Sequence, residues 1–143
     1  MSNENVVITR GKAEEISLFA IYDLLVYGEM GIEADIPSIL SGLSDLPYSE
    51  CDIFSKRMVI AFLKHSQEIV PVFQEKMPKW KFSRLSKLEQ AILFLAYCHF
   101  HYDVEEVKKA VVINYSVSFA KKYLDANDYR FVNAILDKVL VRE

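Results

Sequence analysis

The chain has 143 residues, of which 52% are hydrophobic and 26% charged, a balance typical of one globular domain and not of a disordered chain. Its formal net charge of −3 excludes a protein that binds polyanions over its whole surface, so contact with a nucleic acid needs a local basic patch. Four glycines and four prolines leave few turns, which favours a small number of helices over an all-β fold.

Two cysteines, Cys51 and Cys98, are too few for a disulfide framework, which predicts a reducing, cytoplasmic environment. Residues 1–10 contain neither a long apolar run nor a small-residue cleavage pattern, so no export signal is expected. We expect residues 1–8 to form a loose tail.

Apolar residues recur at helical spacing up to Tyr27, which predicts a first helix that starts near Thr9 or Arg10 and ends at Gly28 in a left-handed turn. A short second helix is expected next, with Pro37 in its first turn and Gly42 at its end.

Segment 49–66 carries apolar residues over much of its circumference and is predicted to be a buried helix. The helical pattern continues over 67–77, but Pro71 lacks an amide donor and clashes with the preceding turn. We therefore expect a separate fourth helix to begin near Pro71. Segment 77–83 is expected to be a hinge.

The segment 84–100 has the strongest helical signal. Ser86 and Glu89 have the spacing of a capping box, in which the two side chains satisfy free amides at a helix start. Residues 91–97 are apolar on every side, and a membrane span needs roughly 18 such residues. This predicts a central core helix that other helices surround.

Segment 107–124 carries one apolar stripe over four helical turns and is predicted to be a helix. Its β-branched run at 111–113 would also suit a strand by propensity alone. The last helix is expected to begin after a cap at Asn127 or Asp128 and to present a clear apolar face.

These segments predict an all-α fold of about seven helices in one domain covering residues 1–143. An N-terminal lobe of about residues 9–77 and a C-terminal lobe of about 78–143 would surround the central helix.

Motifs for catalysis or phosphate binding are absent from the sequence. Cys98 and His101 lie one helical turn apart, but zinc needs three or four ligands and no second pair has a matching spacing. Glu14 and Glu15 are adjacent, so they point in different directions on a helix and are expected on a solvated face. No metal, cofactor or catalytic residue is expected.

Trp80 stands among Lys79, Lys81 and Phe82. It can stack on an RNA base while the lysines contact phosphates, or it can pack between the two lobes. We favour packing, because buried aromatic side chains contribute strongly to cores.

A basic edge in the C-terminal part is the best candidate for an RNA contact. Lys121, Lys122 and Arg130 flank one short connection that holds Tyr129 and the start of the last helix. Free amides at a helix start favour a phosphate, so this combination suits single-stranded RNA.

The second half of the chain resembles the NusB family of bacterial transcription antitermination factors, on the segments WKFSRLSKLEQAILFLAY and KKAVVINYSVSFAKKYLDANDYRFVNAILDKVL. The resemblance is close over residues 80–140, and LFAIY at 18–22 is similar to the family's first helix. It implies an all-α fold of two small lobes without catalysis. It also implies binding of boxA RNA, a heterodimer with the ribosomal protein NusE, and attachment to elongating RNA polymerase.

The resemblance also implies site residues. With Lys122 from the basic edge, the predicted RNA-binding set is Arg10, Lys12, Tyr22, Lys121, Lys122, Asn127, Arg130 and Phe131. Glu89 matches the carboxylate that the family uses toward NusE, and we place Trp80 and Arg84 with it as partner-binding residues. Together these residues predict that residues 10–12 and 121–131 lie side by side as one ligand-binding rim.

The chain departs from the family pattern at several positions. The arginine-rich start is reduced to residues 10–12, with Glu14 where an arginine is common, and Phe94 replaces another arginine. Tyr115 replaces a glutamate and Ala134 a glycine. Fewer cations make fewer phosphate contacts with RNA. For a single strand, each contact contributes about −0.7 to the slope of log affinity against log salt concentration.

Two alternatives follow. The chain can be a NusB-like interaction module that has lost RNA recognition, with Tyr115, Tyr123 and Tyr129 as a protein-binding surface and a monomer or weak homodimer when alone. The fold also occurs as the N-terminal domain of ribosomal RNA cytosine methyltransferases, but we expect no methyl transfer, because no cofactor domain follows.

Overall fold

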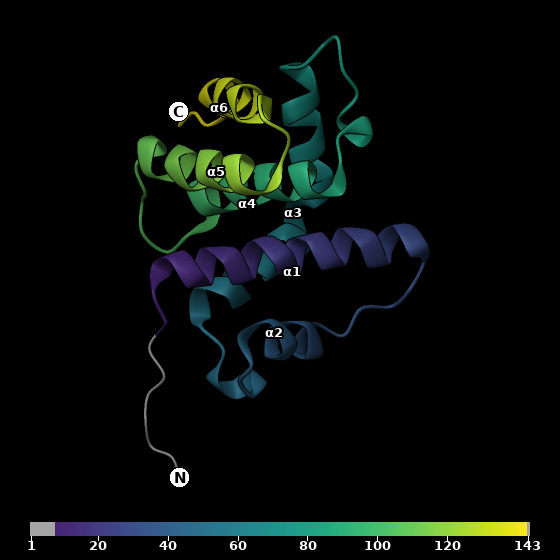
Figure 1. The fold of residues 1–143 in the computed structure, drawn as a ribbon, viewed down its shortest axis with the longest axis vertical. Helices are drawn as coiled ribbons and strands as arrows, with labels where there is room; N and C mark the ends of the chain where they lie inside the picture. Colours follow the sequence, from purple (N-terminus) through teal and green to yellow (C-terminus); the bar gives the residue numbers. More distant parts are fainter. Residues whose placement is uncertain (1–7, 143) are drawn as a thin grey trace.

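The computed structural model describes residues 8–142, and the tail expected before them lies outside this range. Its elements are α1 (Arg10–Met30), α2 (Ile36–Ser44), η1 (Tyr48–Glu50), α3 (Ile53–Glu75), η2 (Phe82–Arg84), α4 (Lys87–Tyr102), α5 (Lys109–Tyr123) and α6 (Asp128–Val139) (Figure 1). Residues 8–142 contain no strand, so the all-α prediction is confirmed. No helix in this range combines the length and apolar character needed to cross a bilayer.

Helix α4 is the central helix, in contact with α1, α3, α5 and α6. Its side chains are buried from Gln90 to Ala96 and again from Cys98 to Phe100, as predicted for a helix that is apolar on every side. The Ser86 hydroxyl accepts a 3.1 Å hydrogen bond from the Glu89 amide, which is the hydroxyl half of the expected capping box.

Helix α3 is continuous through Pro71, so the prediction of a separate fourth helix was wrong. Pro71 and Gln67, whose carbonyl loses its helical donor, both lie on the exposed side of α3. Water can satisfy that carbonyl, while Ile69 and Phe73 bury the opposite side. The helix runs behind α1 and reaches the level of α6 (Figure 1).

Two helix ends differ from the prediction. Helix α1 passes through Gly28 and ends at Gly31, which has a left-handed φ of 70° and donates to the Gly28 carbonyl. Helix α2 passes through Gly42 and ends at Asp45, with φ of 58°. A short polar side chain tolerates this conformation, and an exposed glycine inside a helix costs only about 1 kcal/mol.

Helices α5 and α6 pack against each other as an antiparallel pair beside α4 (Figure 1). The β-branched run of α5 is helical because Val112, Ser116 and Ala120 face the core one turn apart. Packing on one face thus overrides the strand propensity of the run.

Candidate nucleic-acid interface

The start of α1 and the end of α5 lie side by side, joined by the carboxylate of Glu15. Lys12 Nζ is 3.4 Å from Glu15 Oε1, and Lys122 Nζ is 3.5 Å from Glu15 Oε2. The Tyr123 hydroxyl donates a 3.1 Å hydrogen bond to the same Oε2. Two segments from opposite ends of the chain therefore form one edge of the molecule.

Glu15 holds these two lysines near one position. Burial by itself would raise the pKa of Glu15, but the hydrogen bonds from Tyr123 and Lys12 and the charges of Lys12 and Lys122 together lower it. The carboxylate also neutralises part of the local positive charge. A phosphate that binds here must compete with Glu15 for both ammonium groups.

Beyond Glu15, two cations surround the ring of Tyr129 at the start of α6. Lys121 Nζ lies 4.8 Å from the ring centroid, and the Arg130 guanidinium lies 5.8 Å from it. Arg130 Nε also donates to the Tyr129 hydroxyl over 3.4 Å, and this bond with the Arg130 charge lowers the pKa of Tyr129. An aromatic ring beside two exposed cations suits a stacked base with its flanking phosphates.

We call Lys12, Lys121, Lys122 and Arg130 the basic rim. These four cations come from α1, α5 and α6, and all four side chains are exposed. The rim is local, since the chain as a whole is acidic. Its cations are therefore available to a ligand that reaches this edge.

A buried cluster lies at the other side of the α1 start. His99 Nδ1 is 3.0 Å from Glu14 Oε2, and His99 Nε2 is 3.5 Å from Asp103 Oδ2. Asp103 also pairs with Arg10 at 3.8 Å and with Arg57 at 3.7 Å. The Glu14–His99 contact lacks hydrogen-bond geometry, and the two side chains are only 1% and 3% exposed.

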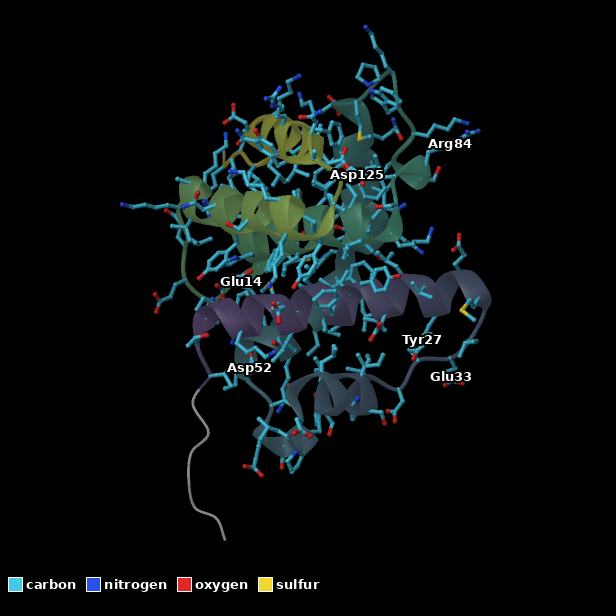
Figure 2. The ribbon with its side chains drawn as sticks, viewed as in Figure 1. Glu14, Tyr27, Glu33, Asp52, Arg84 and Asp125 are labelled. Carbon is cyan, nitrogen blue, oxygen red and sulfur yellow. The ribbon has the colours of Figure 1, made fainter. Side chains whose placement is uncertain are left out.

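The prediction that Glu14 lies on a solvated helix face was wrong. Glu14 lies one turn before Leu18 and two turns before Ile21, both fully buried, so it faces the core between α1 and α4 (Figure 2). This spacing was visible in the sequence. The contact with His99 was not visible in the sequence, because the two residues are 85 positions apart.

The sequence from residue 12 to residue 141 matches the family model described as NusB family. This chain belongs to the NusB family. The transcription antitermination protein NusB of Bacillus mycoides is 28% identical over 130 residues, which cover 91% of this chain and 95% of that protein. The protein of the same name from Finegoldia magna is 36% identical over 90 residues, covering 63% of this chain and 65% of the relative.

Two solved structures share the NusB fold seen here. T. maritima NusB matches with a TM-score of 0.80 at 20% identity, over 94% of this chain and 92% of that one. A chain in the crystal structure of a plectonemic RNA supercoil matches with a TM-score of 0.75 at 19% identity, over 91% and 92%.

Some residues predicted from the NusB resemblance lie outside the basic rim. Arg10 stacks 4.2 Å from the Phe54 ring and pairs with Asp103, and Tyr22 is half-buried against the core. Phe131 is half-buried beside Trp80. Asn127 is exposed at the cap of α6, next to the rim.

The aromatic residues are placed differently from two of the expectations. Trp80 is 66% exposed, so packing of its ring between two lobes was wrong. Phe82, two residues later, is the aromatic residue of this loop that occupies the core. Tyr115, Tyr123 and Tyr129 are each partly buried, so less of each ring is exposed than the alternative interpretation expects.

Cys98 is buried as a neutral thiol, whereas a cysteine that binds a metal does so as a thiolate. Burial raises the pKa of Cys98 to about 12, which keeps the thiol neutral. His101 instead packs on the Tyr97 ring, with 4.3 Å between centroids.

Glu89 on α4 faces Asp128 at the start of α6. Burial raises the pKa of Glu89 to about 7, and the negative charge of Asp128 adds to the rise. This half-buried acid thus changes charge near neutral pH, and a cation placed beside it would favour the ionised form.

The Glu89→Gln variant is expected to be about 1 kcal/mol more stable than the wild type at pH 8 and equally stable at pH 4.5. The pKa of Glu89 is about 7 in the folded chain against an ordinary value of 4.5. The wild type therefore loses stability as the pH rises from 4.5 through 7, and solvent screening of the half-buried group keeps the loss small. Urea unfolding at both pH values measures it, and an equal difference at the two would contradict the raised pKa.

Proposed function

We propose that this protein is a transcription antitermination factor that binds boxA-type RNA together with NusE and tethers it to elongating RNA polymerase. The mechanism is assembly, and no residue acts as a catalyst. The observation that carries the RNA part is the meeting of the α1 start with the end of α5 at Glu15. Because of it, cations from both ends of the chain face one ligand.

The basic rim supplies two kinds of contact to a single strand. Lys12 and Lys122 can each pair with a phosphate when the phosphate displaces Glu15. The Tyr129 ring, with Lys121 and Arg130 beside it, offers a stacking surface for a base. Bases are then distinguished by their edges, while the phosphates fix the position of the strand.

The rim is small, so RNA affinity is modest for the protein alone. Four cations, two of them shared with Glu15, make few phosphate contacts. NusE adds basic surface beside the rim and raises the affinity of the pair above that of either protein.

Glu89 is the proposed contact toward NusE. It is half-buried next to Asp128, and burial raises its pKa to about 7. A cation of NusE placed beside Glu89 would stabilise the ionised carboxylate and form an ion pair with it. The exposed Arg84 projects outward from η2, just before the start of α4 (Figure 2). It is available to pair with an acidic group of the same partner.

The test is RNA binding by this protein, by NusE and by the two together, each with boxA RNA and with a scrambled RNA. The measurement is made at about 50 mM and about 200 mM salt, where phosphate contacts differ most. We expect the pair to prefer boxA and the affinity to fall with salt.

A pair that binds both RNAs equally at both salt concentrations would contradict RNA recognition. A complex with NusE that forms without any boxA preference would instead support the interaction module with lost RNA binding.

A further inference from the structure

An apolar groove lies between the α3–η2 loop and α6, and none of the basic-rim residues lines it. Its volume is about 270 Å³. We call it the Trp80 groove. Its apolar lining consists of Met77, Pro78, Trp80, Phe131, Ala134 and Ile135, and Lys76, Lys79 and Lys138 stand at its edges.

The wall that carries Trp80 is rigid. The Gln74 side-chain amide donates to the carbonyls of Met77 and Trp80 over 3.1 and 2.6 Å, and its oxygen accepts from the Phe82 amide over 2.8 Å. Phe82 is buried, which anchors the end of the loop. The exposure of Trp80 is therefore set by this network, and the groove exists before a ligand arrives.

The charge around the groove has one sign. Lys76, Lys79 and Lys138 are exposed, and no carboxylate is among the residues that line the groove. Asp137, next to Lys138, lies 3.0 Å from Lys109 on α5 instead. A positive edge on a chain with a net charge of −3 favours an anionic partner at this place.

We propose that the Trp80 groove binds an acidic protein segment that places an apolar side chain against Trp80. Apart from the indole N–H of Trp80 and the weakly accepting sulfur of Met77, the apolar lining offers no side-chain hydrogen-bonding group, so a buried base would lose most of the hydrogen bonds that it makes in water. A leucine or phenylalanine side chain has no such edge and gains from burial.

This inference does not rest on the proposed RNA or NusE binding. The Glu89–Asp128 pair is acidic and suits a cation of a partner, whereas the Trp80 groove is basic and suits an anion. Charge thus separates the predicted partner residues into two surfaces, one around Glu89 and one around Trp80. The two can bind different partners at the same time.

The emission of Trp80 tests the proposal directly, because it is the only tryptophan of the chain. The probe is a short synthetic peptide with a leucine and a phenylalanine in the middle and aspartate and glutamate elsewhere. We expect it to shift the emission of the full chain to the blue and to bind more weakly as salt is added. Comparison peptides carry lysine at the acidic positions, or serine at the two apolar ones.

Two variants on α6 locate the binding site. Ala134 lines the groove and Asn133 does not, and both are exposed, so each accepts glutamate without disturbing the core. We expect Ala134→Glu to lower the affinity for the acidic peptide about tenfold, and Asn133→Glu to lower it less than about twofold. Circular dichroism confirms that both variants remain folded.

Several results would overturn the proposal. These are equal binding of the lysine or serine peptide, unchanged binding by Ala134→Glu, or no shift in Trp80 emission at any peptide concentration. A blue shift caused more strongly by single-stranded oligouridine would assign the groove to RNA. A blue shift that appears when the protein is concentrated without any peptide would assign the Trp80 groove to a second copy of this chain.

Discussion

The His99→Leu variant is expected to lower the free energy of unfolding by about 3 kcal/mol or more. Glu14 is 1% exposed, and His99 Nδ1 lies 3.0 Å from its carboxyl group. Leucine fills a similar volume but leaves the buried Glu14 carboxyl group without the polar imidazole beside it. Asp103 is affected less, since Arg10 and Arg57 still pair with it. Urea unfolding at pH 7 measures the loss.

The double variant Glu14→Leu with His99→Leu separates charge from packing. Replacing both partners of a buried pair by apolar side chains is often neutral or stabilising, so we expect most of the lost stability to return. If the double variant is as unstable as the single one, the shape of the His99 ring against Phe54, 5.0 Å away, is the cause instead.

Replacing both Lys121 and Arg130 by glutamate is expected to weaken boxA RNA binding about a hundredfold, or about tenfold for each cation. The two cations surround the Tyr129 ring, so the change removes two phosphate contacts and leaves the stacked base beside negative charge. The slope of log affinity against log salt should fall by about 1.4, because each single-strand contact contributes about 0.7. Fluorescence anisotropy of labelled boxA RNA with NusE present measures both.

A matched control makes the same change of charge elsewhere. Lys64 on α3 and Lys108 at the opposite end of α5 are exposed, and neither belongs to the basic rim. The Lys64→Glu and Lys108→Glu double variant should bind RNA within about threefold of the wild type. An equal loss in both double variants would mean that net charge, and not the basic rim, determines affinity.

Local rules predicted most of the helices. The Ser86 cap, the apolar segment 91–97 and the single apolar face of α6 each depend on neighbours within a few turns, and all three are present. Pro71 shows the limit of such rules. Its cost depends on whether water reaches the Gln67 carbonyl, which only the packing of α3 decides.

The candidate site was predictable in part. The basic residues 121, 122 and 130 lie close in sequence, so their proximity follows from one short connection. Arg10 could not be assigned in this way, because Asp103 and Phe54, which hold it, come from two other helices. Tyr22 and Phe131 have mixed character, and their burial depends on the helices that cover them.

By itself, the sequence determined that this chain is all-helical, that α4 is its central helix, and that it belongs to the NusB family. These depend on periodicity and on motifs, which are local in the chain. Only the tertiary structure decided that Lys12 and Lys122 share Glu15, that Glu14 is buried against His99, and that Trp80 faces solvent. Each of these depends on which distant helix packs alongside, since a side chain's charge state and exposure are set by the neighbours that exclude water from it.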